Sequence, residues 1–408
     1  TVLTGNEWIG WMNDLIIFVL LVGILLHNFA QDTGWNFGKY LAEIVAAVCG
    51  AVCFIGKPFA DGGAFYRSKK TRESHAGWYV LIGICAAVPC LMVLVLLLMS
   101  ADMVFADLLV GFAGVFRFPV KLLRILLMLV FGFLSSYCGV RYVQKHAADI
   151  KPSAGKTAEP LIAIAFTAPI AVLYLLFSAI QIVYLFIGNM QLPAGVTYAE
   201  YARRGFFQLL FVCVLNLAAV LFIQSYFKEN RVLKALLLAI SGCTLIMTAS
   251  SACRMLLYIR AYQLTFLRVS VLVALAVIAL LMAGVIAKIV KPQFPLFRYG
   301  FVLVGAVYLV FSFSHVDYFI AAYNLTHTSW EASGEETVDY SYLYTLSTDA
   351  APAIEKYAGK SGAADYRKQG WYQLYCEANE EALNATGLRT YNVSHAVAKQ
   401  LLMEDNRE

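Results

Sequence analysis

Apolar runs of about 20 residues recur along this sequence, and they constrain its fold more than any other feature. A helix needs about 20 apolar residues to cross the hydrocarbon core of a bilayer. Backbone groups in lipid must be hydrogen-bonded within their own segment, so repeated runs of this length predict helices. The composition agrees, because 61% of the residues are hydrophobic and only 14% are charged, against about 25% charged in soluble proteins. The expected fold class is all-α, a polytopic transmembrane helix bundle.

The apolar runs divide into about eight or nine predicted spans. Their approximate bounds are 8–28, 41–56, 78–99, 119–140, 161–188, 205–227, 232–257, 266–290 and 297–315. The second run is the weakest span, because it is short and carries Glu43. Residues 102–116 are interrupted by Asp102 and Asp107, so we expect a helix in the membrane interface there. The helix that begins at Val232 should continue to Tyr262, about 46 Å, so its last turns should leave the ~30 Å core.

A change in charge divides the chain near His315. Residues 1–315 hold 24 Lys and Arg against 12 Asp and Glu, a net charge of +12, whereas residues 316–408 hold 7 against 14, a net of −7. The apolar runs end at the same point. We therefore expect a transmembrane helical domain over 1–315 and a small, acidic, mainly helical soluble segment over 316–408. Within this segment, Ser347 and Ser394 are expected to cap helices.

Lys and Arg in the short loops predict the orientation of the spans. One face collects Lys57, Arg67, Lys69, Lys70, Arg72, Arg141, Lys145, Lys151, Lys156, Lys228, Arg231, Lys234, Lys288, Lys291 and Arg298. The other face collects Lys39, Arg117, Lys121, Arg124, Arg203, Arg204, Arg254, Arg260 and Arg268. The richer face should be cytoplasmic, which places the acidic segment outside the cytoplasm. The positive charges on the poorer face then need an explanation.

Five of those unexpected charges should lie close together. The stretch TYAEYARRGFF carries Arg203 and Arg204 directly before a span, and Arg254, Arg260 and Arg268 flank the next two spans at the same side. Consecutive spans with short connections are normally neighbours. We therefore predict an anion-binding site at the outer lip of the bundle. Its expected residues are Glu200, Tyr201, Arg203, Arg204, Arg254 and Tyr258.

A structural interpretation of the same residues is equally open. Glu200 can pair with either following arginine on a helix, and tyrosines and arginines often sit at headgroup depth without a specific ligand. Glu200 or backbone carbonyls would then satisfy Arg254. A second polar stripe comprises Tyr174, Ser178, Gln181 and Tyr184, joined by Asn216 of the next span. This stripe should face the bundle interior, either as helix-to-helix hydrogen bonds or as part of a substrate path.

The sequence predicts no metal site and no cofactor. His315, Asp317 and His327 follow no recognised ligand spacing. Eight of the nine cysteines lie in apolar runs, where a free cysteine is usually a small apolar side chain, and Cys376 alone lies in the acidic segment. No phosphate-binding glycine loop and no nucleic-acid module is present, so nucleic acid is not an expected partner.

Three stretches together resemble a known family. They are YAEYARRGFFQLL, the stretch from Arg254 to Arg268, and VDYSYLYTLSTDAAPAIEKY. They resemble a bacterial multi-pass membrane protein family catalogued as domain of unknown function 4173, which is related to domain of unknown function 4153. The resemblance implies a bacterial cytoplasmic (inner) membrane location and no particular reaction. Where the family pattern has glycine, this chain has Gln263.

Three functions remain open on the sequence. The first is a transport or binding protein whose arginines and tyrosines hold an anionic small molecule or a lipid headgroup. The second is a membrane enzyme acting on a lipid-linked substrate at the outer face, with an acid or base drawn from Asp32, Asp102, Asp107 or Glu200. The third is a membrane sensor in which the acidic segment binds a membrane or extracytoplasmic protein partner. Membrane lipids are expected contacts in each case.

Overall fold

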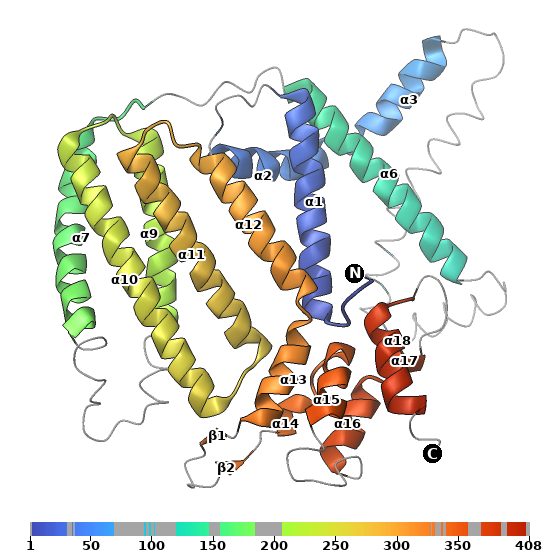
Figure 1. Ribbon diagram of the computed structural model, residues 1–408. Helices are drawn as coiled ribbons and strands as arrows, with labels where there is room; N and C mark the ends of the chain where they lie inside the picture. The colour runs from blue at the N-terminus through green and yellow to red at the C-terminus, as the bar shows by residue number, and fades with distance from the viewer. Residues whose placement is uncertain are drawn as a thin grey trace. The chain divides into compact units, whose positions relative to one another are not determined.

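A computed structural model describes most of the chain (Figure 1). The chain divides into two compact units. The described residues are 2–30, 35, 37–68, 94, 98, 102, 120–146, 156–183, 206–327, 329–330, 336–337, 340–357, 369–384 and 390–404. Unit 1 consists of Thr1–Ile17 and Ala154–Glu408, and unit 2 consists of Phe18–Ser153. The predicted span at 78–99 and the interface helix at 102–116 lie almost wholly outside the described residues.

Unit 1 contains a bundle of long helices that lie side by side in Figure 1. They are α7 (Pro160–Gln181), α9 (Phe206–Tyr226), α10 (Arg231–Tyr262), α11 (Phe266–Val290) and α12 (Leu296–Phe313). Helix α10 packs against α7, α9 and α11, and α11 packs against α12. The bounds agree closely with the predicted spans, including the extension of α10 to Tyr262. Helix α7 is described to Gln181 with Ile182 still in helical conformation, and the predicted end of this span at residue 188 lies outside the described residues.

Six of the described helices are long and apolar enough to cross a membrane, namely α1 (Glu7–Phe29) and these five. Leu237, Val220 and Met282 form part of the buried core between α9, α10 and α11. The outward surface is also apolar: Leu173 and Phe211 are 61% and 67% exposed. Large apolar side chains on the outside of a bundle are unfavourable in water and suit lipid. Helices and exposed surface together identify a membrane-embedded protein.

The two ends of the bundle differ in charge. One end carries seven of the cations predicted for the cytoplasmic face, Lys156, Lys228, Arg231, Lys234, Lys288, Lys291 and Arg298. Glu229 lies among them and pairs with Lys156 at 2.7 Å and with Lys234 at 2.5 Å. Hydrogen bonds from these two lysines lower the pKa of Glu229 to about 2. The predicted segregation of charge is therefore present in the fold of unit 1.

The chain after α12 forms short helices around a core that also includes Ile9 of α1 and Phe311 of α12. They are α13 (Val316–Thr326), α14 (Tyr340–Leu343), η3 (Thr348–Ala350), α15 (Ala351–Tyr357), α16 (Gly370–Ala378), α17 (Glu380–Asn384), α18 (Val393–Lys399) and the π-helical turn η6 (Gln400–Glu404). Ile320, Leu343, Ile354 and Tyr375 are fully buried at their centre. Two short antiparallel strands, β1 (Ser329–Trp330) and β2 (Glu336–Thr337), were not expected.

One of the two predicted helix caps in this segment is correct. The hydroxyl of Ser347 accepts a hydrogen bond from the amide of Asp349 at the start of η3. The cap of α18 is Asn392, whose side chain accepts from the amide of Ser394. The prediction of Ser394 as the cap is wrong, because Asn392 precedes it and fills the same role two residues earlier.

Two buried carboxylates hold the residues before α1, and we call this arrangement the N-terminal clasp. The Thr4 hydroxyl donates to Asp349 Oδ2 at 2.5 Å, and the Gly5 amide donates to Asp349 Oδ1 at 3.1 Å. Asn6 Nδ2 donates to Asp317 Oδ2 at 2.9 Å. Asp317 and Asp349 are both nearly inaccessible to solvent. The start of α1 therefore lies at the same end of the bundle as α13–α18.

The turn between α10 and α11 is fixed by hydrogen bonds to Asn324 of α13 and to His327, the C-cap of that helix. Gln263 has φ 64° and ψ −175°, and it is only 2% exposed. Its Nε2 donates to the carbonyl oxygens of His327 at 2.7 Å and Asn324 at 3.4 Å. The Asn324 amide bonds both backbone groups of Leu264, accepting from N and donating to O at 2.9 Å each. The backbone here has a conformation that glycine adopts readily, although the residue is glutamine.

Unit 2 contains the rest of α1 together with α2 (Phe37–Cys53), α3 (Lys57–Ser68) and α6 (Val120–His146). Asp61 of α3 accepts hydrogen bonds from the Tyr137 hydroxyl and from Arg141 Nε of α6, both at 2.8 Å. Gly50 of α2 lies directly against the ring of Tyr142, so any side chain there would overlap it. At 17 residues, α2 is too short to rank among the candidate spans.

Candidate ligand site at the end of helices α7 and α10

A cluster of polar side chains joins α7 to α10 near the end of the bundle that carries α13–α18. Gln181, the last residue of α7, accepts a hydrogen bond from the Ser250 hydroxyl at 2.6 Å. The same oxygen, Oε1, lies 3.4 Å from Nη2 of Arg254, one turn further along α10. Arg254 is only 8% exposed. A permanent positive charge is therefore held inside the helix bundle at this point.

Two further buried serines lie one helical turn before the residues that make these contacts. Ser178 precedes Gln181 by three residues on α7, and Ser251 precedes Arg254 by three residues on α10. Their exposures are 3% and 0%, and neither hydroxyl has a hydrogen-bond partner among the described residues. A buried hydroxyl without a partner is costly, so it commonly marks the place of a bound water, ion or ligand. We call Gln181, Ser178, Ser250, Ser251 and Arg254 the arginine–serine cluster.

Of the six predicted site residues, Arg254 and Tyr258 are described. The other four, Glu200, Tyr201, Arg203 and Arg204, lie outside the described residues. The chain enters α9 at Phe206, which is 2% exposed and packs with Met255 and Ile259 of α10. Phe206, the first described residue after Arg204, therefore packs in one cluster with Met255, the neighbour of Arg254.

The structure places Tyr258 with Arg268 rather than in the arginine–serine cluster. The Arg268 guanidinium lies over the Tyr258 ring, 4.4 Å from its centroid. Its Nη1 donates to the carbonyl oxygens of Tyr262 and Gln263, at 2.6 and 2.5 Å. Arg268 therefore satisfies carbonyl groups at the C-terminal end of α10, where cations are favoured. Arg260 is exposed on the same helix. The arginines of this face therefore serve different purposes.

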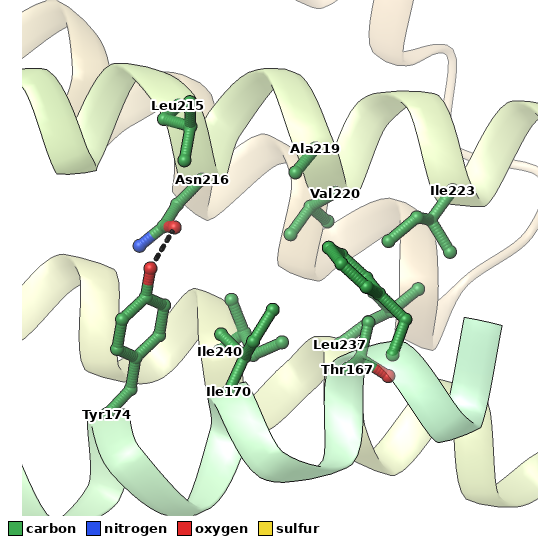
Figure 2. A pocket seen from close by; sticks show the side chains of 11 residues that line it. Thr167, Ile170, Tyr174, Leu215, Asn216, Ala219, Val220, Ile223, Leu237 and Ile240 are labelled. Carbon is green, nitrogen blue, oxygen red and sulfur yellow. Dashed lines mark hydrogen bonds between the residues drawn. The ribbon is translucent and has the colours of Figure 1, made fainter.

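The predicted inward-facing stripe of α7 is confirmed for the residues that are described. The Tyr174 hydroxyl donates to Asn216 Oδ1 at 2.9 Å, and Asn216 Nδ2 donates to the Thr244 hydroxyl at 3.0 Å. This chain of hydrogen bonds links α7, α9 and α10 about two helical turns before Gln181, closer to the middle of α7. Figure 2 shows the contact between Tyr174 and Asn216 at one side of an apolar pocket. Ser178 and Gln181 of the same stripe are buried.

Sequence reasoning found Arg254 and Gln181 but gave no role to the serines of α10. The signal was present, because Ser250 and Ser251 precede Arg254 by four and three residues, which places them near it on the helix. Serine is common in membrane helices as a small packing residue, so composition alone did not distinguish these positions.

No group of three or more His, Cys, Asp or Glu side chains within the described ranges is arranged to hold a metal ion. Asp317 and Asp349 are engaged in the N-terminal clasp. His315 lies 3.4 Å from Asp349 through its Nδ1, as an additional contact of that clasp. The chemistry that the arginine–serine cluster offers is hydrogen bonding to an anion by a guanidinium, hydroxyls and an amide.

Comparison with known proteins gives a family but no activity. No curated protein and no solved structure matches the chain. A family model described as a domain of unknown function (DUF4153) matches residues 1–357. The resemblance pointed to domain of unknown function 4173, whereas the family matched is the related DUF4153. The chain, with its six apolar helices, therefore belongs to the DUF4153 family.

Proposed function

We propose that the chain is a transport or binding protein of the bacterial inner membrane, with a site for an anionic ligand or lipid headgroup at its outer face. The observation that carries the proposal is the burial of Arg254 in the same cluster as Ser178 and Ser251, two buried serines whose hydroxyls have no described partners. A guanidinium makes two parallel bonds to one phosphate or carboxylate, and serine hydroxyls donate further bonds to the same group. These donors together suit an oxyanion.

The residues that precede α9 in the sequence complete the proposed site. Arg203 or Arg204 would add a second guanidinium, with Tyr201 beside it. Glu200 would neutralise part of this charge when no ligand is bound. The packing of Phe206 against Met255 supports this arrangement, because it brings the start of α9 to the turn of α10 that carries Arg254.

The proposed topology puts this site and the residues 316–408 outside the cytoplasm. The cation-rich end of unit 1 would face the cytoplasm by the distribution of Lys and Arg. The N-terminal clasp supports an even number of crossings, because it holds the start of α1 at the end where α13–α18 lie. Eight or nine spans were predicted. If α2 does not cross the membrane, eight spans remain, and this number is even.

Thermal unfolding of the purified protein in detergent, with and without added phosphatidylglycerol, tests the site. We expect the anionic lipid to raise the midpoint for the wild type, and phosphatidylcholine to raise it less. Arg254→Lys should lose nearly as much of this shift as Arg254→Ala, because a point charge cannot replace a two-pronged contact. Ser251→Ala should lose part of it, and Glu200→Gln should keep or increase it.

Arg260→Ala is the matched control, since Arg260 is an exposed arginine six residues further along the same helix. It should retain the full lipid-dependent shift. If Arg254→Ala merely lowers the midpoint and leaves the shift unchanged, then Arg254 has only a structural role and the ligand site is refuted.

A further inference from the structure

The apolar pocket between α7, α9 and α10 lies on the same three helices as the arginine–serine cluster. It has a volume of about 80 Å³, and Figure 2 shows the side chains that enclose it. Ile170 of α7, Val220 and Ile223 of α9, and Leu237 and Ile240 of α10 supply most of its wall. The pocket is part of the core that joins these helices.

The polar groups that line the pocket are already hydrogen-bonded to other protein groups. The Tyr174 hydroxyl donates to Asn216, whose amide donates to Thr244. The Thr167 hydroxyl donates to the carbonyl oxygen of Ala163 at 2.7 Å. A buried water needs two to four polar partners, and an apolar cavity without them stays dry and binds apolar molecules. The lining therefore selects hydrocarbon rather than water or a polar solute.

The rim of the pocket reaches the outer surface of the bundle. Phe166 and Leu215 line the pocket and are 63% and 51% exposed. Both lie within helices apolar enough to span a membrane, so the molecules outside this rim are lipid chains. A chain can therefore enter sideways from the bilayer without passing through water.

The depth of the pocket matches one leaflet. Ile170 precedes Gln181 by eleven residues on α7, a rise of about 16 Å at ~1.5 Å per residue. Half of the hydrocarbon core is about 15 Å. A lipid whose headgroup lies at the arginine–serine cluster would therefore have the ends of its chains at the level of the pocket.

We infer that the pocket binds the terminal part of a hydrocarbon chain of the anionic lipid whose headgroup contacts Arg254. This inference rests on the proposed function, and it narrows the ligand from an anion to an amphiphile. An apolar cavity of about 80 Å³ is costly to leave unfilled, so its occupancy by a hydrocarbon chain is favoured.

Photolabelling tests the inference directly. The protein is reconstituted in vesicles that contain phosphatidylglycerol with a diazirine near the end of one chain. After irradiation, labelled peptides are mapped by mass spectrometry. We expect labelling of pocket residues of α7 and α9 in excess of that on outward residues such as Phe211. Ala219→Leu, which places a larger side chain in the pocket lining, should lower pocket labelling by about an order of magnitude.

The neighbouring alanine supplies the control. Ala218 is exposed on α9 and does not line the pocket, so Ala218→Leu should leave the labelling unchanged. Ile223→Ala enlarges the pocket and should retain or increase labelling, which keeps the test valid if Ala219→Leu fails to fold. Labelling confined to outward residues, or lowered equally by both leucine variants, overturns the inference.

Phosphatidylcholine with the same labelled chain separates this inference from the headgroup proposal. Equal labelling of the pocket by the two lipids would support binding of a hydrocarbon chain in the pocket and would refute the anion site. If the lipid-dependent shift of the thermal midpoint requires Arg254 but the pocket is not labelled, the anion site is supported and binding of a chain in the pocket is refuted. Pocket labelling that is stronger for phosphatidylglycerol supports both.

Discussion

The turn at Gln263 allows a quantitative prediction, because two opposing effects meet in one residue. Its φ of 64° and ψ of −175° lie in a region that is nearly exclusive to glycine, and a residue with a side chain there costs about 1–3 kcal/mol. Its side-chain amide meanwhile bonds the carbonyl oxygens of His327 and Asn324. Such bonds contribute about 1–2 kcal/mol together when one of them is long.

Replacement by glycine and by alanine should therefore have different effects. Gln263→Gly loses the hydrogen bonds but relieves the backbone strain. The greater conformational freedom of glycine in the unfolded chain offsets about 0.5–1 kcal/mol of that gain in stability. Its stability should remain within about 1 kcal/mol of the wild type. Gln263→Ala loses the same bonds and keeps the strain, so it should be less stable than the wild type by about 1–2 kcal/mol.

Hydrogen exchange of the peptide that covers the turn measures this difference locally. The Leu264 amide, which donates to Asn324 Oδ1, is the reporter. In Gln263→Ala its exchange should be about 5–30 times faster than in the wild type, and in Gln263→Gly nearly unchanged. Equal acceleration in both variants would show that the backbone conformation carries no cost here, and the reasoning from φ would be wrong.

Three further predictions concern other parts of unit 1. Burial raises the pKa of Asp317, so the stability linked to this group is fully present below the ordinary pKa of about 4 and is lost as the pH rises through the raised value. As the pH increases through this raised pKa, the thermal midpoint of the wild type should fall, whereas that of Asp317→Asn should change less. An identical dependence of the midpoint on pH in the two proteins would count against the argument. Tyr391→Cys, at a 59% exposed position, should react with a membrane-impermeant maleimide in intact spheroplasts, whereas reaction only after lysis would reverse the proposed topology. Gly284→Ala would drive a methyl group into the ring of Tyr299 and should lower stability by about 1–3 kcal/mol, while Gly305→Ala, in open space, should not.

The helices of the bundle could be predicted from the sequence because their cause is local. Each run of apolar residues satisfies its own backbone in lipid, so its length and its flanking charges set its bounds. The cap at Ser347 was predictable for the same reason. The N-terminal clasp was not predictable, because Thr4 and Asp349 are 345 positions apart and neither carries a pattern that indicates the other.

The candidate site was predicted in part. Helical spacing placed Gln181 and Tyr174 on an inward stripe and drew attention to Arg254, which is buried in the structure. The pairing of Tyr258 with Arg268 depends on the turn at Gln263, whose geometry no spacing rule supplies. The partial burial of Cys376, which raises the pKa of its thiol, also depends on tertiary packing.

The N-terminal clasp has a consequence for how the protein is made. Thr4 binds Asp349, and its carbonyl oxygen accepts from Asn392 Nδ2 at 2.8 Å. At about 5–20 residues per second, the ribosome reaches these partners roughly 20–80 s after Thr4. Helix α1 is therefore synthesised well before the residues that precede it can be bound. Closure of the clasp is a late event in biosynthesis, and a nascent chain that stops before Asn392 leaves those residues open to proteases and chaperones.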